Sequence, residues 1–285
     1  MRKDLLRVPA KTSFEVFAVI VHFKKEKVLH ETVRNVLRFL DEDQICIVDN
    51  SETLDSSKFQ HLLALPNPGF GAGMNVGVAY MRKRHSSAKY ALLLSHETLI
   101  SATDFERLLA ALKENRNLGV VGPALYLPSG KVWSYGGLFN ENRISPKHIL
   151  DSRKSSYVDW IDGACLLVNL EMFTLVGGFD TDFVQAWEDV ALGFQMRRLG
   201  KQMKVIKEAK AIQTCTGVPR TTAFRNNWVL SLKYHDTTHS IRLFCFCVVK
   251  ISTSLLKFQF KIASEIVRGS LEGVTTSLKR KYERD

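Results

Sequence analysis

The chain has few cysteines, and their spacing gives no sign that they pair. The five cysteines are odd in number, and no two stand in Cys-x-x-Cys spacing: Cys46, Cys165, Cys215, Cys245 and Cys247. This pattern indicates neither a disulfide framework nor a cysteine-based zinc site. Most of them lie inside apolar runs, which predicts reduced, buried thiols in a cytosolic protein.

Long hydrophobic runs are also lacking. Residues 1–13 are mixed in charge and broken by Pro9, which is unlike a signal peptide. The longest apolar run near the C-terminus, Leu243 to Val249, is far shorter than the ~20 residues that cross a bilayer. We therefore expect a cytoplasmic protein that is neither secreted nor transmembrane. The sequence shows no internal repeat.

Acidic residues are outnumbered, because 40 Lys and Arg stand against 29 Asp and Glu, for a net charge of +11. Such a balance favours an anionic partner, namely nucleic acid, a nucleotide diphosphate or an acidic membrane surface. Nucleic acid is the weakest of these, because the chain lacks an arginine-rich helix or an aromatic RNA-binding motif. With 285 residues and 45% hydrophobic content, one large domain or one domain plus an appendage can bury a sizeable core.

Alternating strand and helix patterns predict an α/β sheet. Residues 16–23 form a continuous apolar run typical of a strand buried on both faces, and apolar residues recur at helical spacing through 28–40 before a short strand at 45–48. This is a βαβ unit. The same alternation continues through 72–84, 90–95, 103–115 and 118–121. Ligands of such sheets bind at the carboxyl ends of the strands.

The second half adds loops and completes the sheet. Residues 123–156 are rich in Gly, Ser, Pro and Asn, with a hairpin expected at Pro128 to Gly130, and we expect them to face an acceptor. Further predicted elements are a strand at 163–168, a short helix, a Gly-Gly turn, a helix at 188–199 and a strand at 203–206.

From Ile241 onward, apolar residues share a helical pattern with lysines and arginines. Basic amphipathic helices of this kind often lie in the plane of an anionic membrane surface. The alternative, helices packed on the catalytic core or on another subunit, has nearly equal weight. The boundaries expected are an N-terminal extension at 1–13, an α/β domain at 14–235 and a basic helical segment at 236–285.

Four blocks carry side chains suited to chemistry. They are Asp49 to Ser51, the glycine-rich loop Asn67 to Gly77, Ser95 to Glu97, and Trp187 to Asp189. An acidic pair alone is usually a helix cap. In this order and spacing, over about residues 15–235, the blocks resemble family 2 glycosyltransferases of the GT-A fold, especially the bacterial rhamnosyltransferase-like branch. The resemblance implies a mainly parallel central sheet flanked by helices.

The resemblance implies a nucleotide-sugar donor site. Asp49 would bind the nucleobase, although an Asx turn at the strand end accounts for the same residue. The glycine loop lacks the dinucleotide fingerprint, because Met74 and Val76 occupy the place of its third glycine. The residues that the resemblance assigns to donor binding are Asp49, Asn50, Asn67, Gly69, Asn75, Ser95 and Arg225, the last of these steadying phosphate charge.

The metal position departs from the family pattern. Ser95 to Glu97 stands where the family has Asp-x-Asp, and Glu97 supplies one oxygen ligand for a divalent cation, Mg or Mn. His96 suits softer metals. The family also has a metal-assisting histidine after the last core strand, where this chain has Gln213. Metal dependence is therefore the weakest part of the resemblance.

The acidic pair supplies the expected chemistry. An inverting transfer is a single displacement, in which one ionised carboxylate takes the proton of the acceptor hydroxyl. The resemblance assigns this base to the pair Glu188 and Asp189, and we favour Asp189. Trp187 and Gly163 would lie on the acceptor side, although a core tryptophan is the commoner explanation of such a residue.

The function expected is an inverting glycosyltransferase at the inner face of the cell membrane. It would move a sugar from a nucleotide-diphosphate donor to a glycan or lipid-linked glycan in cell-surface polysaccharide synthesis. The resemblance favours rhamnose as this sugar. The alternative is a binding or scaffold protein of the same fold that has lost catalysis, which the altered Ser95 to Glu97 block and the missing histidine motivate.

Overall fold

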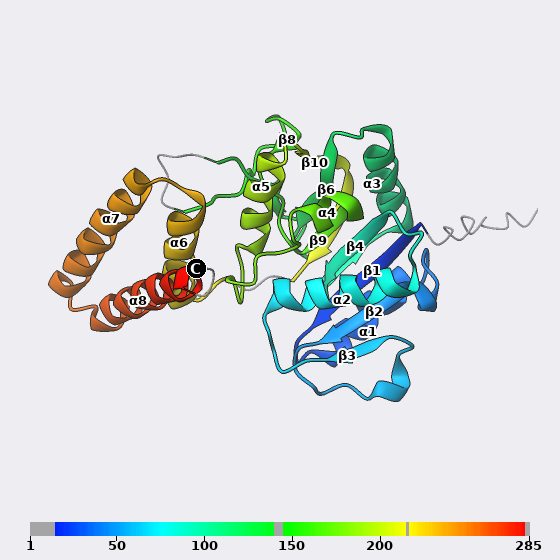
Figure 1. The fold of residues 1–285 in the computed structure, drawn as a ribbon, viewed down its shortest axis with the longest axis horizontal. Coiled ribbons are helices and arrows are strands. Elements are labelled where there is room, and N and C mark those ends of the chain that lie inside the picture. The colour runs from blue at the N-terminus through cyan, green and yellow to red at the C-terminus, as the bar shows by residue number, and fades with distance from the viewer. Residues whose placement is uncertain (1–14, 140–144, 215–216, 283–285) are drawn as a thin grey trace, which may run out of the picture.

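The computed structural model describes residues 15–139, 145–214 and 217–282. An α/β core occupies one side of the molecule, and three long helices form a separate layer beside it (Figure 1). The predicted N-terminal extension at 1–13 lies outside the described residues.

The elements follow one another in the order expected of an α/β chain. The strands are β1 (Val16–His22), β2 (Ile45–Asp49), β3 (Leu62–Ala64), β4 (Tyr90–Ser95), β5 (Thr98–Ile100), β6 (Leu118–Tyr126), β7 (Val132–Ser134), β8 (Tyr157–Val158), β9 (Cys165–Asn169) and β10 (Gln202–Gln213). The helices are α1 (Glu26–Val36), η1 (Glu42–Gln44), η2 (Ser56–Lys58), α2 (Phe70–Arg84), α3 (Ala102–Glu114), α4 (Leu170–Leu175), α5 (Glu188–Arg198), α6 (Arg220–Tyr234), α7 (Thr237–Leu256) and α8 (Phe260–Tyr282).

The strands form one sheet in the order β3-β2-β1-β4-β9-β6-β10-β5, with β7 added beside β6 and β8 beside β10. The first four strands run parallel, as do β6 and β10. Strand β9 is antiparallel to β4 and β6 and joins the two parallel parts. The predicted α/β class is confirmed, and the antiparallel pairs were not visible in the sequence.

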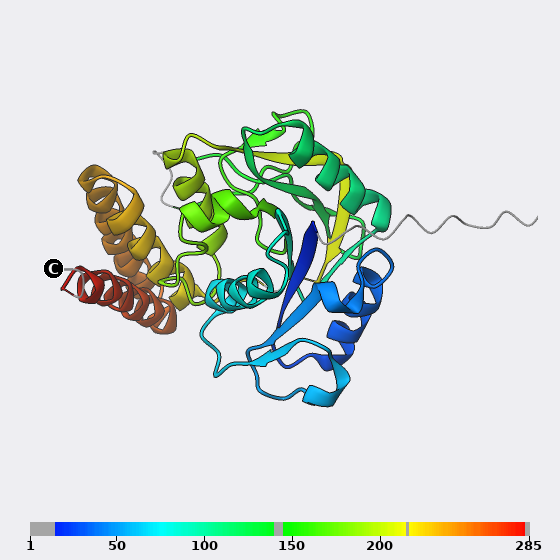
Figure 2. The same cartoon turned by 45° about the vertical axis from the view of Figure 1, so that its right-hand side comes forward.

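Helices cover both faces of the sheet (Figure 2). Every residue of β1 is buried, and successive residues alternate between two hydrophobic cores. One core contains Ala18 and Ile20 with side chains of α1 and α3, and the other contains Phe17 and Val19 with side chains of α2, α4 and α5. The parallel strands are therefore buried on both faces, as their continuous apolar runs predict.

Helix α2 approaches the sheet closely enough to require glycine. A Cβ on Gly77 would lie 2.4 Å from a methyl group of Val19 and 2.9 Å from one of Val48. At the start of the helix, Gly69 has φ +102°, and its Cβ would lie 2.5 Å from the carbonyl oxygen of Val184. A side chain at either position would push the glycine-rich loop away from the strand ends.

Strand β10 is three times as long as predicted. The sequence indicated only 203–206, whereas β10 spans Gln202–Gln213, with Ala209 and Ala211 buried and Lys210 and Ile212 exposed on the other face. A strand with one solvated face has an alternating pattern, not an apolar run. Strands β3 and β5 were missed because they have only three residues each.

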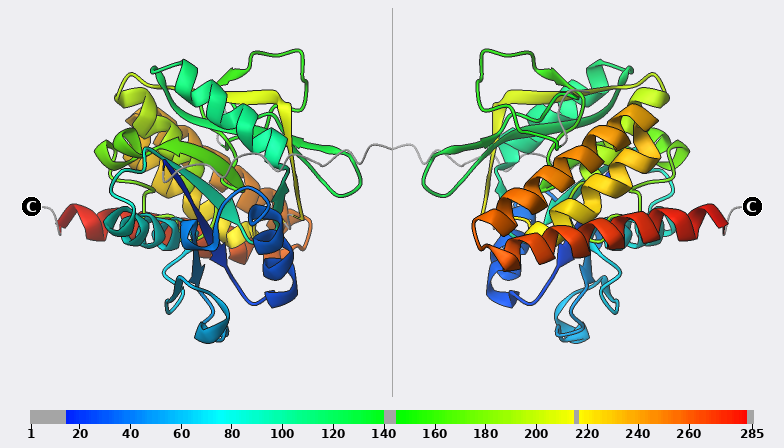
Figure 3. Two further views of the ribbon diagram at one scale, coloured as in Figure 1. Left: turned by 90° about the vertical axis from the view of Figure 1, so that its right-hand side faces the viewer. Right: turned by 90° about the vertical axis from the view of Figure 1, so that its left-hand side faces the viewer.

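The helices α6, α7 and α8 form a layer at one side of the core (Figure 3). They share a small hydrophobic cluster made of Trp228 from α6, Leu243 and Cys247 from α7, and Ile266 from α8. Helix α6 precedes the predicted boundary at residue 235 but packs against the helices that follow it. It therefore connects the α/β core to the C-terminal layer.

Helix α7 corrects two expectations. It is 20 residues long with mean hydropathy 1.4, so by length and composition it could cross a membrane, and the run Leu243 to Val249 is only its central part. Serine and threonine residues interrupt the apolar run at both ends, so the run in the sequence is shorter than the helix. Cys245 on this helix is exposed, so the prediction that the thiols are buried is wrong there; Cys46, Cys165 and Cys247 are buried. Cys215 lies outside the described residues.

Candidate active site

Polar residues gather where β1, β2 and β4 end. His22 pairs with Asp49 between β1 and β2, and Val21 pairs with Ser95 between β1 and β4. All three strands are parallel, so their carboxyl ends meet at one edge of the sheet, where ligands of this architecture bind. The first and third sequence blocks therefore lie together, as predicted.

Asp49 organises the loop after β2. One carboxylate oxygen accepts hydrogen bonds from the N–H of Ser51 at 2.9 Å and from its hydroxyl at 2.6 Å. The other accepts from the N–H of Thr53 at 2.7 Å and of Leu54 at 2.9 Å. Burial alone would raise the pKa of Asp49, but these hydrogen bonds lower it overall. The Asx-turn alternative is thus present in the structure, and Asp49 shapes the loop beside the expected nucleobase position.

Asn50 connects this loop to the glycine-rich block. Its side-chain N–H donates to the carbonyl oxygen of Gly69 at 3.0 Å, and its buried Oδ1 has no hydrogen-bond partner among the described residues. The Cα of Gly73 faces the same amide, because a Cβ there would lie 3.0 Å from Oδ1. Asn67 is exposed at φ +42° in the turn that precedes Gly69. The structure therefore brings together Asn50 and Gly69, two of the residues predicted to bind the sugar nucleotide, with Asn67 in the turn just before Gly69.

Asn75 has a different task from the one predicted. Its Oδ1 accepts from the N–H of Phe179 at 2.8 Å, and its Nδ2 donates to the carbonyl oxygen of Phe179 at 2.8 Å. Both ends of the amide are therefore used by the backbone of the loop after the Gly-Gly turn. Asn75 holds the glycine-rich block against the acidic block and does not point an open amide at a donor.

Glu97 lies beside a lysine and a histidine. Its carboxylate forms an ion pair with Lys25, and one oxygen lies 3.8 Å from Nε2 of His96. Gln213, the residue at the expected histidine position, ends β10 opposite Thr98, and the next residue, Thr214, donates its N–H to the carbonyl oxygen of Glu97 at 3.3 Å. The fold thus places Gln213 where the resemblance expects the second metal residue, but with an amide side chain.

Two histidines lie behind this edge. The rings of His22 and His96 meet edge to face with centroids 5.0 Å apart, and neither ring nitrogen of His22 has a hydrogen-bond partner among the described residues. Burial and then the neighbouring His96 lower the pKa of His22 to about 4. Burial also lowers the pKa of His96. Both rings are therefore neutral at neutral pH, and the charged groups at this edge are Asp49, Lys25 and Glu97.

The acidic pair begins α5 and connects to the glycine-rich block and to the block that starts at Ser95. The Cβ and Cγ of Glu188 contact Gly71 of the glycine-rich block, since a Cβ there would lie 3.2 Å from each atom. Asp189 accepts a hydrogen bond from the N–H of Gly163 at 2.8 Å. Ala164, the next residue, accepts from the N–H of Ser95 at 3.0 Å. The pair thus lies in a continuous chain of contacts with the ends of β2 and β4.

The two carboxyl groups hold protons more tightly than usual. Glu188 is 4% exposed, and its Oε2 has no partner in the part of the chain that the structure describes. Burial, then the charge of Asp189, raises the pKa of Glu188 well above its ordinary value. Burial, then the charge of Asp162, raises the pKa of Asp189 to about 7. A carboxylate with a pKa near neutrality can take a proton during a reaction and release it afterwards.

The turn before the pair has an unusual backbone. Ala186 and Trp187 both have positive φ, at 62° and 71°, a region that side chains with a Cβ rarely adopt. Asn226 of α6 is fully buried and donates to the carbonyl oxygens of Gln185 at 2.8 Å and of Ala186 at 2.9 Å. Helix α6 therefore holds the strained turn that aims the acidic pair.

A second contact ties α6 to the same loop. Lys233 contacts Asp180 at 2.6 Å and Asp182 at 2.7 Å, and the hydroxyl of Tyr234 donates to Asp180 at 2.6 Å. Arg225 donates to Oδ1 of Asn226 at 3.0 Å. The predicted phosphate ligand is therefore engaged in the support of the loop. Sequence analysis missed Lys233 and Tyr234, and only their place on the helix after the last strand could have indicated them.

Gly163, the residue expected on the acceptor side, follows Asp162, which is held by two side chains. Asp162 accepts hydrogen bonds from Trp133 at 2.8 Å and from His148 at 3.1 Å. A groove of about 430 Å³ opens beside His148. Its lining residues are Leu138, Phe139, Lys147, His148, Ile149, Leu150, Asp151 and Lys154. The predicted acceptor loops thus contribute a groove, and its lining residue His148 contacts Asp162, which precedes Gly163 in the chain.

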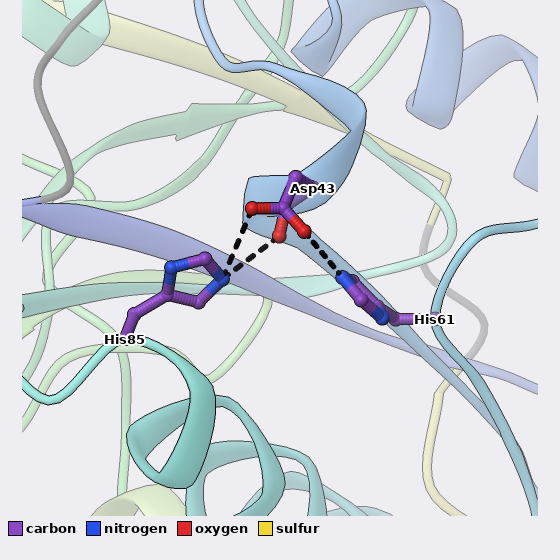
Figure 4. A group of neighbouring side chains, drawn as sticks. All are labelled: Asp43, His61 and His85. Carbon is purple, nitrogen blue, oxygen red and sulfur yellow. Dashed lines mark hydrogen bonds and ion pairs between the residues drawn. The ribbon is translucent and has the colours of Figure 1, made fainter.

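The described residues contain one group of three side chains that could hold a metal ion, Asp43, His61 and His85 (Figure 4). It precedes β2, β3 and β4, whereas Glu97 follows β4. At the edge where β4 ends, Glu97 presents the carboxylate expected of it, which is paired with Lys25. A magnesium ion is commonly held by one or two carboxylates together with the phosphates of a substrate, so this donor set fits such an ion.

Comparisons with known proteins define the fold. No protein-family model and no curated protein matches the chain. Among solved structures, GalNAc-T7 with UDP, GalNAc and Mn²⁺ is 13% identical with a TM-score of 0.58. The mannosyltransferase PcManGT from Pyrobaculum calidifontis, in complex with GDP-Man and Mn²⁺, is 8% identical with a TM-score of 0.52. S. aureus TarS is 11% identical, also with a TM-score of 0.52.

These similarities cover most of the chain. They extend over 76% of it for GalNAc-T7, 91% for PcManGT and 81% for TarS. The chain in turn spans 47% of GalNAc-T7 and 42% of TarS, and 87% of PcManGT. These neighbours are glycosyltransferases of the GT-A type, and the chain has their fold. The predicted fold class is confirmed.

Proposed function

We propose that this chain is an inverting glycosyltransferase of the family 2, rhamnosyltransferase-like type. It transfers a sugar from a nucleotide-diphosphate donor to a glycan or lipid-linked glycan. The observation that carries the proposal is the position of Glu188 and Asp189, which lie against Gly71 on one side and Gly163 on the other at the carboxyl edge of a GT-A sheet. A helix cap alone would need neither contact.

The donor binds along the strand ends. The loop shaped by Asp49 receives the nucleobase, and Asn50 with the backbone near Gly69 approaches the diphosphate. The exposed Asn67 and the partly buried Ser95 border this space. The free Oδ1 of Asn50 accepts a hydrogen bond there, since a buried amide oxygen without a partner is costly to maintain.

Glu97 would hold a divalent cation, Mg or Mn, which would supply positive charge to the diphosphate. Two of the similar structures contain Mn²⁺ together with a nucleotide or nucleotide sugar. When bound, the ion neutralises charge that builds up on the departing diphosphate. Lys25, paired with Glu97, contributes a second positive charge at the same place. Gln213 provides an amide oxygen near the ion in place of an imidazole.

Asp189 acts as the base. Its carboxylate accepts the proton of the acceptor hydroxyl while that oxygen forms a bond to the anomeric carbon. The bond from this carbon to the diphosphate oxygen breaks on the opposite face, and the electron pair leaves with the diphosphate. Asp189 accepts hydrogen bonds from the N–H groups of Gly163 and Val190, at 2.8 Å each. These two bonds fix the orientation of its carboxylate. Glu188 remains protonated beside it.

The acceptor approaches from the side of the groove at His148. Lys147 and Lys154 line this groove, so it suits an acceptor that carries negative charge. Trp187 is partly buried among Phe183, Val190 and their neighbours, and its exposed part borders the acidic pair. It supports the acceptor side and packs in a core at the same time.

The turn between α7 and α8 attaches the protein to the inner face of the cell membrane. Leu256 is 80% exposed, Phe258 81% and Phe260 62%, and Lys257 and Lys261 lie among them. Apolar side chains at such a tip enter the lipid interface, while lysines contact anionic headgroups. Helix α7 lies in the layer with α6 and α8, with Leu243 and Cys247 buried between them, which favours attachment by the tip over a membrane span.

A panel of nucleotide sugars tests the function. Each is added to the protein with and without manganese, and melting temperature and sugar transfer to lipid-linked acceptors are measured. A donor at a hundredfold its Kd adds about 2.7 kcal/mol of stability. We expect one donor class to stabilise the protein and be consumed. Stabilisation without transfer to any acceptor would instead support the inactive binding protein, and stabilisation by none of the donors would contradict both.

A further inference from the structure

Two histidines and one aspartate converge at the edge of the sheet opposite the donor. Asp43 lies in η1 just before β2, His61 just before β3, and His85 just after α2. Figure 4 shows both imidazole rings directed at the carboxylate of Asp43. Strand β2 separates this cluster from Asp49 by about 13 Å, at ~3.3 Å per residue. The cluster therefore belongs to a different site from Glu97.

The spacing of the three side chains fits a single ion. Nε2 of His61 lies 3.1 Å from one carboxylate oxygen of Asp43, and Nε2 of His85 lies 3.8 Å from the other. All the ligand atoms lie within 4.8 Å of one another. Two ligands of a tetrahedral zinc ion, each with a bond of about 2.0–2.1 Å, lie roughly 3.3 Å apart. Only small side-chain movements are needed to bring all three onto one ion.

The surroundings supply the outer contacts that metal-bound histidines commonly have. His61 and His85 are each 7% exposed, whereas Asp43 is partly exposed and leaves a path for an ion. The other ring nitrogen of His61 lies 3.3 Å from the hydroxyl of Tyr80. A metal-bound histidine commonly has such an outer partner, which fixes its tautomer and ring orientation. Gln60 also donates to Asp43 at 3.0 Å and steadies the carboxylate.

We propose that Asp43, His61 and His85 bind a zinc ion that stabilises the fold. Two imidazoles with one carboxylate favour zinc over magnesium or calcium, which prefer oxygen ligands. Water fills the fourth position, because Asp43 borders solvent. The ion joins η1, the segment before β3 and the end of α2. It has no part in sugar transfer.

A hydrogen-bonded trio is the competing explanation. Nε2 of His85 also lies 2.9 Å from the carbonyl oxygen of Asp43, so a proton on this nitrogen would satisfy it without a metal. The two arrangements differ in what they predict. Zinc competes with protons for the imidazole nitrogens, so its affinity falls as pH falls, whereas a trio without metal binds no zinc at any pH.

Zinc binding by the full-length, metal-stripped chain tests the proposal. We expect one zinc per chain with a Kd of micromolar or below, measured by competition with a chromogenic chelator. Zinc at a hundredfold its Kd should raise the melting temperature by roughly 5–10 °C. Magnesium at the same concentration should not. Cobalt in place of zinc should give the visible absorption of a tetrahedral ion.

Three variants separate this site from other histidines. His85→Gln and Asp43→Asn should weaken zinc binding at least tenfold and abolish the cobalt spectrum. His30→Gln is the matched control, because His30 on α1 also has a carboxylate neighbour, Glu26 at 3.3 Å, but lies outside the cluster. Less than one zinc per wild-type chain, or equal zinc affinity in wild type, H85Q and D43N, would overturn the proposal. Asp43→Asn keeps the result interpretable if His85→Gln does not fold.

Discussion

Asn226 of α6 donates a hydrogen bond at 2.9 Å to the carbonyl oxygen of Ala186, a residue at positive φ two positions before the acidic pair. The contact links the C-terminal helical layer to the strained turn. The orientation of Glu188 and Asp189 therefore depends on a helix that lies far along the chain from them.

Asn226→Ala should lower the rate of transfer more than it weakens donor binding. The variant leaves the carbonyl groups of Gln185 and Ala186 without their side-chain donor and costs about 1–3 kcal/mol of stability. The backbone of the turn then relaxes, and the carboxyl groups of Glu188 and Asp189 are no longer held in the orientation that transfer needs. Steady-state kinetics and a melting curve measure the two effects. Asn227→Ala is the control, because the neighbouring Asn227 bonds to Ser145 and not to the turn. Equal kinetic losses in both variants would show a general effect on α6.

Asp189→Asn should leave the fold and donor binding intact and reduce turnover by roughly a hundredfold or more, the scale of lost general-base catalysis. Wild-type turnover should rise with pH through about 7, because the base must be ionised and burial raises the pKa of Asp189 to about 7. Initial rates from pH 5 to 9 measure this. Turnover unchanged in the variant would move the base to Glu188 or contradict the enzyme proposal.

The melting temperature of the Glu188→Gln variant should fall less with rising pH than that of the wild type. A carboxyl group whose pKa is raised in the folded protein stabilises it below the unfolded pKa, and this contribution disappears as pH rises through the folded value. The pKa of Glu188 is raised well above its ordinary value, so wild-type stability should fall from about pH 4 upward. Gln carries no such proton. Melting temperatures from pH 4 to 9 should decline less in the variant, and parallel curves would argue against a buried proton on Glu188.

Glu97→Ala should weaken binding of a nucleoside diphosphate when manganese is present and change little when a chelator is present. The carboxylate contributes through the ion, so its loss matters only with the ion. Calorimetry under both conditions measures this. Glu52→Ala, in the loop after β2, is a control acid near the same edge. If the wild-type affinity is the same with and without chelator, Lys25 and other basic residues neutralise the diphosphate without a metal.

Leu256→Ser with Phe258→Ser should release the protein from anionic vesicles and leave transfer to a soluble acceptor unchanged. Each basic residue near an anionic leaflet contributes about 1 kcal/mol, and the apolar tip adds burial in the interface. Flotation with phosphatidylglycerol vesicles measures binding, and added salt should weaken it. Leu175→Ser is the control, because it removes another exposed leucine, at 63%, from helix α4. If wild type ignores vesicles at low salt, the tip packs on another protein.

The sequence predicted the parallel part of the sheet well because buried strands read as continuous apolar runs. β4 matches its predicted bounds, and α2 begins within two residues of the prediction. Pairings between distant strands leave no local pattern, so the antiparallel placement of β9 between β4 and β6 could not be foreseen. Short strands such as β5 and β8 have too few residues to show a period.

The candidate site was predictable as a set of strand ends and loops, but not as a set of contacts. Topology placed Asp49 and Ser95 at one edge, and the resemblance alone assigned Asp189 to the same site. What each side chain does there depends on partners far away in sequence, such as Phe179 for Asn75 and Asn226 for Ala186. The positive φ of Trp187 also has no signal in the sequence, because a tryptophan rarely adopts it.

The packing of α6 between the core and α8 also matters for engineering. Trp228 and Ile266 bury each other, so a shortened chain without α7 and α8 would expose one face of α6 while its other face still has to hold the catalytic turn. Under the proposed function, exchanging the C-terminal helices between related enzymes should then alter turnover as well as membrane attachment. The C-terminal helices therefore support the turn that carries the acidic pair, and under the proposed function their removal would affect transfer as well as attachment.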